Sequence, residues 1–317
     1  MKYIWTSVAL LLCVGSAHGA GVPGPCVNVL SENKLWYQNS RMEETKALLL
    51  QARQEGFRSI RLNLFPAAVA EGGVDAVDAW YQSLRVLVTY GNSIGLHMII
   101  DLHESNRCGV DSSECRRLTT EFWSRTAGMF SDTRFDVSYE LLNEPKGEMV
   151  SQWGALYPQL IKLVRSKDRH HSIIVGGKGY STIWDLPPAD PDQERIIYTF
   201  HYYNPMSFTH QGADWLKAHP SLAERRNIGW GSYADRTRLA IDFRSVDGWR
   251  SRNDAPLFLG EFGVFKRAPA EDRVVWLSSV ARMSEQRGIT WCLFDYEGGF
   301  GVEGLLPTIQ KGARRQP

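Results

Sequence analysis

Short apolar runs alternate along this chain with longer segments in which apolar residues recur every three or four positions. The first pattern predicts buried strands, and the second predicts amphipathic helices. The predicted strands are residues 26–30, 57–64, 96–103, 137–142, 172–177, 195–203, 255–263 and 288–295. The predicted helices are residues 41–55, 74–93, 115–130, 148–167, 232–251 and 269–287. Eight strands separated mostly by helices predict an α/β fold, a (β/α)8 TIM barrel in a single domain.

The competing architecture is an open, doubly wound sheet. A sheet of that kind that binds dinucleotides carries a Gly-rich phosphate turn after an early strand. No such turn follows the early predicted strands, so the barrel is favoured. We expect the last residues, 311–317 (KGARRQP), to form a solvated and poorly ordered end.

The first 20 residues have the features of a secretory signal peptide. Lys2 supplies the positive start, residues 8–14 the apolar stretch, and residues 17–19 (AHG) a small-x-small cleavage site. The apolar stretch is too short to span a bilayer, and no later stretch approaches about 20 apolar residues. We therefore predict a secreted or periplasmic protein, without membrane association after processing, whose barrel comprises residues 21–317.

The balance of charged residues bears on the kind of partner that the protein can bind. The chain has 36 basic and 35 acidic residues, a balance that argues against a nucleic-acid partner.

Export permits disulfides, and pairing is favoured for Cys108 and Cys115, which lie in a predicted polar loop. Cys26 and Cys292 lie on the first and last strands, where a second bridge and two buried free thiols are equally acceptable. The wide spacing without a CxxC pair gives no zinc signal.

Polar and aromatic side chains gather where the predicted strands end. In a barrel these ends share one rim, the face that carries chemistry, whereas core positions are expected to hold Val, Ile and Leu. Pro145 cannot continue a strand ladder, so the fourth strand must end beside Glu144. The rim residues are Arg61, His103, Asn143, Glu144, His201, Tyr203 and Glu261, with Trp291 and Phe294 on the last strand.

Glu144 and Glu261 lie on the fourth and seventh predicted strands, across the barrel from each other. Glycoside hydrolysis uses such a pair, one carboxyl as acid and the other as nucleophile or base, and a retaining enzyme sets them about 5–5.5 Å apart. The two roles require different surroundings. Arg61 and a Tyr hydroxyl beside one carboxylate would favour its ionised form, and the other can stay protonated. No Ser–His pair, P-loop or HExxH motif competes with this interpretation.

Several ordered stretches resemble the family 5 glycoside hydrolases, in the wider clan of retaining (β/α)8 glycosidases. They are RLNL, IIDLH, ELLNEP, HYYNP followed by FTHQGADW, LGEFG and WCLFDYEGGFG, and they span about residues 26–305. The resemblance implies that Glu144 is the acid/base and Glu261 the nucleophile. It further implies that Asn143 holds the sugar 2-hydroxyl, that Arg61 and Tyr203 lie beside the nucleophile, and that His103 and His201 position substrate and acid.

The last strand departs from the family pattern. Members usually end it with a Trp sugar platform in a pattern like Trp-x-x-Trp, whereas here Trp291 matches the first place and Phe294 the second. Phe keeps a stacking face but lacks the indole donor. Trp36, Trp184 and Trp215 lie in predicted rim loops, where each can bind sugar or simply pack.

These observations predict an exported, retaining endo-β-1,4-glucanase that hydrolyses β-glucan by double displacement and acts as a monomer. The alternatives are a β-mannanase, a xyloglucanase or a β-1,3-glucanase, and, from another class, an inactive carbohydrate-binding barrel. We expect no metal or organic cofactor, because protonation and covalent capture supply the chemistry. The acidic residues of 190–194 lack EF-hand spacing and are expected in a solvated loop, and His170 and His171 are expected to be exposed.

Overall fold

The computed structural model describes residues 21–30, 36–37, 41–216 and 224–315. The predicted signal peptide, residues 1–20, lies outside the described residues. No helix in the described ranges is long and apolar enough to cross a lipid bilayer.

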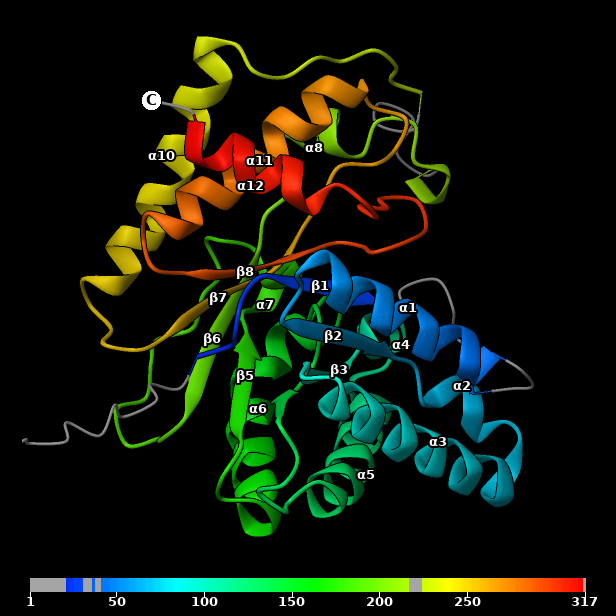
Figure 1. Ribbon diagram of the computed structural model, residues 1–317. Helices are drawn as coiled ribbons and strands as arrows, with labels where there is room; N and C mark the ends of the chain where they lie inside the picture. Colours follow the sequence, from blue (N-terminus) through cyan, green and yellow to red (C-terminus); the bar gives the residue numbers. More distant parts are fainter. Residues whose placement is uncertain (1–20, 31–35, 38–40, 217–223, 316–317) are drawn as a thin grey trace, which may run out of the picture.

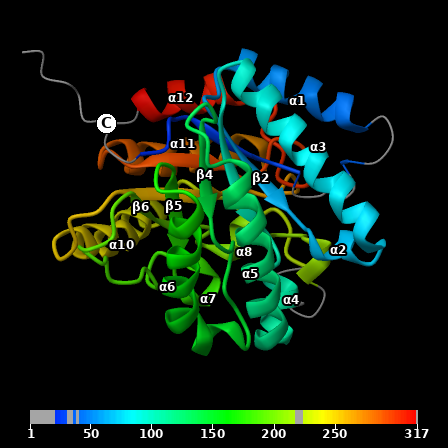
Figure 2. The same cartoon turned by 90° about the horizontal axis from the view of Figure 1, so that it is seen from below.

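The strands form a closed, parallel barrel in which each strand pairs with its neighbours in chain order and β8 returns to β1. Helices surround this barrel on the outside (Figures 1 and 2). The predicted (β/α)8 TIM barrel is therefore confirmed. The strands are β1 (Cys26–Val29), β2 (Ser59–Leu64), β3 (His97–Leu102), β4 (Val137–Glu140), β5 (Ser172–Gly176), β6 (Ile196–His201), β7 (Leu257–Phe262) and β8 (Thr290–Leu293).

The main helices coincide with the predicted amphipathic segments to within three residues at each end. They are α1 (Arg41–Glu55), α3 (Gly73–Ser93), α5 (Ser112–Met129), α6 (Met149–Lys167), α10 (Tyr233–Arg250) and α11 (Ala270–Glu285). Shorter helical turns lie in the connections: α2 (Ala67–Ala70), α4 (Ser105–Val110), α7 (Lys178–Ser181), α8 (Met206–Thr209) and η1 (Asp214–Leu216).

The barrel interior changes from apolar to polar along the strands. Near their starts, Ile99, Ile174, Ile197 and Phe258 form a buried cluster together with Cys26 and Cys292. Because successive side chains on a strand alternate between faces, the residue two positions further on points to the same side. Asp101 follows Ile99 in this way, and Thr199 follows Ile197. The alternation of side chains along the strands thus places an apolar cluster near the strand starts and polar side chains near the strand ends.

The chain end differs from the sequence expectation. Residues 306–315 form helix α12 (Leu306–Arg315), which lies beside α11 (Figure 1). Leu306, Ile309 and Ala313 are buried, and their spacing of three and four residues makes one apolar helix face. The predicted disordered tail is therefore wrong through residue 315, because the neighbouring charges obscured the apolar position at Ala313.

Both candidate cysteine pairs are disulfides. Cys26 and Cys292 are register partners on the adjacent strands β1 and β8 and are bonded across 266 positions of sequence. Cys108 and Cys115 are bonded across 7 positions. This second bridge joins α4 to the first turn of α5 rather than lying in an irregular polar loop.

His171 is buried, contrary to the expectation of an exposed side chain, whereas His170 is exposed. The Nδ1 atom of His171 lies 2.6 Å from Asp168 Oδ2, and Nε2 lies 2.8 Å from the Phe135 carbonyl oxygen. Tyr139 on β4 donates to the same Asp168 oxygen at 2.6 Å. The histidine was misjudged because Phe135 and Tyr139, which also contact it, lie more than 30 residues away in sequence, whereas Asp168 alone is close.

Candidate active site

A cavity of about 310 Å³ opens where the carboxyl ends of the strands meet. Its lining mixes acidic, amide and aromatic side chains. The lining residues are His103, Asn143, Glu144, Tyr203, His210, Trp215, Glu261, Phe294, Asp295 and Phe300. The structure therefore brings together most of the rim residues predicted from the sequence.

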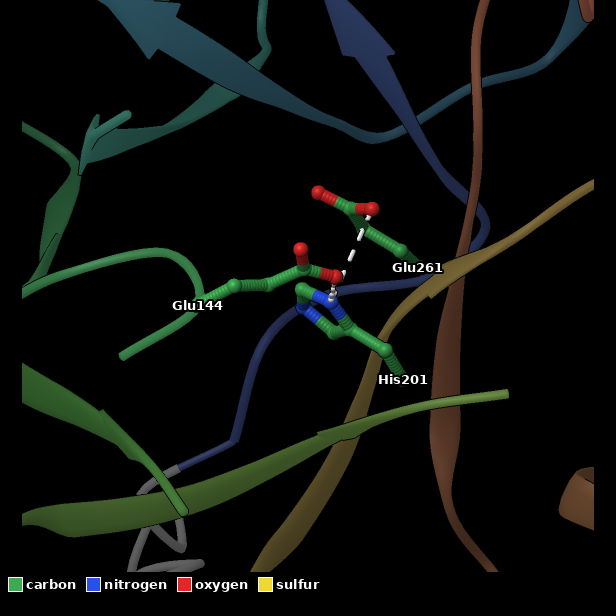
Figure 3. Close-up of side chains that lie close together, drawn as sticks. All are labelled: Glu144, His201 and Glu261. Carbon is green, nitrogen blue, oxygen red and sulfur yellow. Dashed lines mark hydrogen bonds and ion pairs between the residues drawn. The ribbon is translucent and has the colours of Figure 1, made fainter. Parts of the chain in front are cut away.

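Glu144 lies beyond the end of its strand. The predicted strand reaches residue 142, but β4 ends at Glu140, so Glu144 belongs to the following connection. Its Oε1 lies 2.9 Å from Nδ1 of His201 at the end of β6, and its side chain is 21% exposed (Figure 3). Burial raises the pKa of Glu144 above that of a free glutamate. This carboxyl can therefore keep its proton where a solvated one would lose it.

Glu261 on β7 has different neighbours. Arg61 Nη1 donates to its Oε1 at 2.7 Å, and the Tyr203 hydroxyl donates to its Oε2 at 2.9 Å. These two donors fix the orientation of a carboxylate that is 5% exposed. The arrangement leaves Glu144 without the cation that Glu261 has, as the sequence analysis predicted.

His201 lies beside both carboxyl groups (Figure 3). Its Nδ1 is 3.6 Å from Glu261 Oε2 as well as 2.9 Å from Glu144 Oε1. Burial lowers the pKa of His201 to about 4, so the ring is neutral at ordinary pH. One oxygen of Glu144 and one of Glu261 lie within 4.8 Å of each other and of a His201 ring nitrogen.

These three side chains could also hold a metal ion, because their donor atoms lie within 4.8 Å of one another. In the structure the same atoms already serve the hydrogen bonds given above. The fully buried guanidinium of Arg61 lies 2.7 Å from Glu261 and disfavours a second cation there. The absence of a metal requirement stays a prediction.

Arg61 on β2 is the centre of a buried polar network that sequence analysis described only in part. Its Nε and Nη2 donate to the two oxygens of Glu140 at 2.6 and 2.9 Å, and its Nη1 donates to Asn28 Oδ1 at 2.6 Å. Burial raises the pKa of Glu140 to about 7, although the ion pair with Arg61 opposes this shift. Glu140 was not singled out because it lies inside the predicted strand 137–142 and not at its end.

The amide of Asn143 connects this network to His103. Asn143 Oδ1 accepts from Arg61 Nη2 at 2.8 Å, and Asn143 Nδ2 lies 3.2 Å from His103 Nε2. On the other side of its ring, His103 Nδ1 lies 2.6 Å from Asp101 Oδ2. Asn143 can thus present its amide to a substrate hydroxyl with a fixed orientation.

An aromatic wall closes the other side of the cavity. Trp215 packs on Phe300 with ring centroids 5.8 Å apart, and Phe294 lies 5.4 Å from Phe300. His210 joins them at 5.3 Å from Phe300. Sequence analysis singled out neither His210 nor Phe300, nor Asp295, although the matching stretches FTHQGADW and WCLFDYEGGFG contain them. Adjacent aromatic residues in a rim loop were the available signal.

Three of the candidate sugar-binding tryptophans lie elsewhere. Trp291 is buried and its Nε1 lies 3.1 Å from Glu285 on α11, so it faces the helix layer and not the cavity. Its predicted supporting role is therefore wrong, because the alternation along β8 turns it outward while Phe294 enters the site. Trp36 is buried against Trp80, with ring centroids 6.2 Å apart. Trp184 is exposed but does not line the cavity.

The chain is similar in sequence to proteins named endoglucanases. Endoglucanase H of Acetivibrio thermocellus is 26% identical over 227 residues, 70% of this chain but 23% of its own length. Endoglucanase C of the same organism is 26% identical over 237 residues, 64% of this chain and 68% of its own length. The chain thus spans about a quarter of the first relative and two thirds of the second.

Solved structures of Thermotoga maritima Cel5A are similar to this chain in fold. Thermotoga maritima Cel5A in complex with cellobiose superimposes with a TM-score of 0.80 at 25% identity, covering 92% of this chain and 97% of its own. The complex of Cel5A with mannotriose gives a TM-score of 0.75 at 27% identity, covering 83% and 86%. The family profile described as cellulase (glycosyl hydrolase family 5) matches residues 16–299. The chain therefore belongs to glycosyl hydrolase family 5 and is a glycoside hydrolase.

Proposed function

We propose that this protein is an endo-β-1,4-glucanase that hydrolyses β-glucan with retention of configuration. The observation that carries the proposal is the pair Glu144 and Glu261, whose nearest oxygens lie within 4.8 Å in unequal surroundings. Retaining glycosidases set their carboxyl groups about 5–5.5 Å apart, whereas inverting enzymes leave roughly 6.5–9.5 Å for a water molecule. The short spacing favours direct attack by one carboxylate.

In the first step, Glu261 Oε attacks the anomeric carbon C1 and forms a glycosyl ester. The bond from C1 to the glycosidic oxygen breaks, and the Glu144 proton goes to that oxygen, which leaves as an alcohol. Arg61 and Tyr203 hold the attacking carboxylate, and His201 contacts both carboxyl groups. Because its pKa is raised, the Glu144 carboxyl group keeps the proton that it donates in this step.

In the second step, Glu144 acts as a base. It takes a proton from a water molecule, the hydroxide oxygen bonds to C1, and the ester bond to Glu261 breaks. Both catalytic groups return to their starting protonation states, and two inversions at C1 give net retention. A barrel that only binds sugar would need neither the paired carboxyls nor the Arg61 and Tyr203 contacts to one of them.

The choice of β-1,4-glucan is supported by the names of the relatives, which are endoglucanases, and by the cellobiose complex of Cel5A. β-Mannan is the second candidate, because Cel5A was also solved with mannotriose. Phe294 offers a stacking face to either sugar. Comparing hydrolysis of cellotetraose and mannotetraose distinguishes the two substrates.

We also propose that residues 1–20 direct export and that the catalytic barrel comprises residues 21–317. The two disulfides support this proposal, because disulfides persist mainly in oxidising compartments. N-terminal sequencing of the protein recovered outside the cytoplasm would test the predicted cleavage site.

The roles of the glutamates are tested by azide rescue with an activated aryl β-cellobioside. In Glu144→Ala the glycosyl ester can form, because a phenolate leaves unprotonated, but its breakdown stalls without a base. Azide needs no deprotonation, so it should restore turnover and yield the β-glycosyl azide. In Glu261→Ala, azide should attack from the vacated face and give the α-azide.

Both variants must first show the circular dichroism spectrum of the parent protein. Trp184→Ala serves as a matched control, since Trp184 lies outside the cavity lining, and it should keep turnover without azide. The same azide anomer from both glutamate variants would mean that the assigned roles are wrong.

A further inference from the structure

The peptide that carries Glu144 is held by side chains from two neighbouring connections. Glu144 lies four residues beyond the end of β4. Its N–H donates to a side-chain oxygen, Ser105 Oγ, at 3.0 Å. Glu144 therefore depends on contacts outside the strand ladder for its position.

Ser105 approaches from the connection after β3, at the start of α4. Its hydroxyl oxygen accepts from the Glu144 N–H and, at 3.2 Å, from Nδ2 of Asn143. Ser105 is 5% exposed, so water does not replace these bonds easily. One hydroxyl thus holds both the backbone of Glu144 and the amide of Asn143.

Ser181 approaches the same peptide from the connection after β5. Its hydroxyl donates to the carbonyl oxygen of Asn143 at 2.9 Å, and the side chain is fully buried. The N–H of Tyr180 donates to the carbonyl oxygen of Pro145 at 3.2 Å. The carbonyl oxygens of Asn143 and Pro145, the residues before and after Glu144, therefore both accept hydrogen bonds from one turn.

This turn has an unusual backbone. Gly179, Tyr180 and Ser181 have φ values of 66°, 66° and 52°, and only glycine adopts such values without cost. A Cβ at Gly176 would clash with Ser181 Oγ, so glycine there leaves the space that the hydroxyl occupies. Left-handed non-glycine residues persist where surrounding contacts hold them, often at functional sites.

We propose that Ser105 and Ser181 are positioning residues that clamp the Glu144 peptide from opposite sides and aim its carboxyl at the glycosidic oxygen. This inference rests on the proposed acid/base role of Glu144. Proton transfer in the transition state requires hydrogen-bond reach, and a displacement of about 1 Å can lower the rate by roughly 100-fold. Loss of either hydroxyl should therefore impair proton transfer more than covalent capture.

The test compares kcat/KM of Ser105→Ala and Ser181→Ala on two aryl β-cellobiosides. A phenyl leaving group needs protonation, whereas a 2,4-dinitrophenyl leaving group does not. With the phenyl substrate we expect a loss of about 10- to 100-fold, and with the dinitrophenyl substrate a loss of about threefold or less. Ser105→Thr, which keeps the hydroxyl, should restore the phenyl activity.

Two further variants separate positioning from general damage to the fold. Ser181→Cys keeps the size of the side chain but offers a weak donor, so it should show the same selective loss even where alanine impairs folding. Thr182→Val lies in the same turn and loses a bond to Asp185 Oδ2, not to the Glu144 peptide. It should leave the ratio of the two activities unchanged.

An equal loss on both substrates, or no loss, in folded serine variants would overturn the clamp. The same selective loss in Thr182→Val would also overturn it. Glu144→Ala is measured in parallel: without a selective loss there, the acid/base role itself fails. A selective loss in Glu144→Ala that the serine variants do not share refutes the positioning role alone.

Discussion

At the scale of single residues, two glutamates of the same chemistry are made different by their neighbours. Glu144 faces His201, which burial keeps neutral, whereas Glu261 receives hydrogen bonds from a guanidinium and a phenol. Burial raises the pKa of Glu144 although cationic neighbours oppose the shift, so this carboxyl favours its protonated form more than a free glutamate does. The site therefore holds one group ready to give a proton and another oriented to attack.

The pH profile should report the acid. Burial raises the pKa of Glu144 above its ordinary value of 4.5, so the proton is retained at higher pH than in a free glutamate. We predict that kcat/KM on a phenyl β-cellobioside falls as the pH rises through this raised pKa, which lies above 4.5. With a 2,4-dinitrophenyl leaving group this alkaline limb should disappear, because bond cleavage then needs no acid. A limb that is the same for both leaving groups would contradict the assignment.

The residues recoverable from sequence are those that carry recognisable chemistry at strand ends. Arg61, His201, Tyr203 and both glutamates were found this way and meet at the rim. Glu140, Ser105 and Ser181 were not, because the buried glutamate acquires a role only through its distance to another strand, and the two serines through distances between separate connections. Those distances depend on the closure of the whole barrel.

At the scale of elements, the end of each strand decides which side chains reach the site. The period of two along β8 sends Trp291 to the helix layer, whereas Phe294, beyond the strand end, enters the cavity. The motif comparison assigned a sugar contact to Trp291, but the side chain of Trp291 points to the opposite face of the strand and packs against a helix. The helix α12 was missed because its apolar residues are few and lie among several charged residues in a short segment.

The connection between α6 and β5 should carry a pH-dependent part of the stability. Burial alone would raise the pKa of Asp168, but hydrogen bonds from His171 and Tyr139 lower it to about 2. Burial alone would lower the pKa of His171, but Asp168 raises it above 6.5. The His171 contribution is fully present below pH 6.5 and is lost as the pH rises through the raised value. The Asp168 contribution is present above pH 3.8 and is lost as the pH falls towards about 2.

We therefore predict that Asp168→Asn lowers the free energy of unfolding by about 3 kcal/mol at pH 5, because it weakens a buried ion pair. The loss should be smaller at pH 9 than at pH 5, because less of His171 is protonated in the folded chain at the higher pH. Urea denaturation at the two pH values measures this. Asp192→Asn, in the exposed loop, is the matched control and should change stability by less than about 0.5 kcal/mol. A loss that is the same at both pH values would refute the coupling to His171.

At the scale of the whole molecule, a covalent bond joins the first strand of the barrel to the last. Cys26 and Cys292 are partners in the β1–β8 register, so the bridge lies across the seam where the sheet closes. A cross-link restricts the unfolded chain more as the loop it closes becomes longer. The two disulfides among the described residues, across 266 and 7 positions, differ greatly in that respect.

We predict that Cys26→Ala/Cys292→Ala lowers the free energy of unfolding by about 5 kcal/mol, against roughly 2 kcal/mol for Cys108→Ala/Cys115→Ala. Urea denaturation of the two double variants under identical conditions provides the comparison. Equal losses, or a larger loss for the short loop, would show that loop entropy does not govern the contribution of the seam bridge.

The seam bridge also changes the covalent topology of the molecule. With residue 26 bonded to residue 292, the segment between them is a macrocycle. A single proteolytic cut within that ring produces two fragments that migrate together until a reductant is added, and both halves of the rim stay tethered. Because Glu144 and Glu261 both lie inside the ring, a nicked enzyme retains its acid and its nucleophile in one covalent particle.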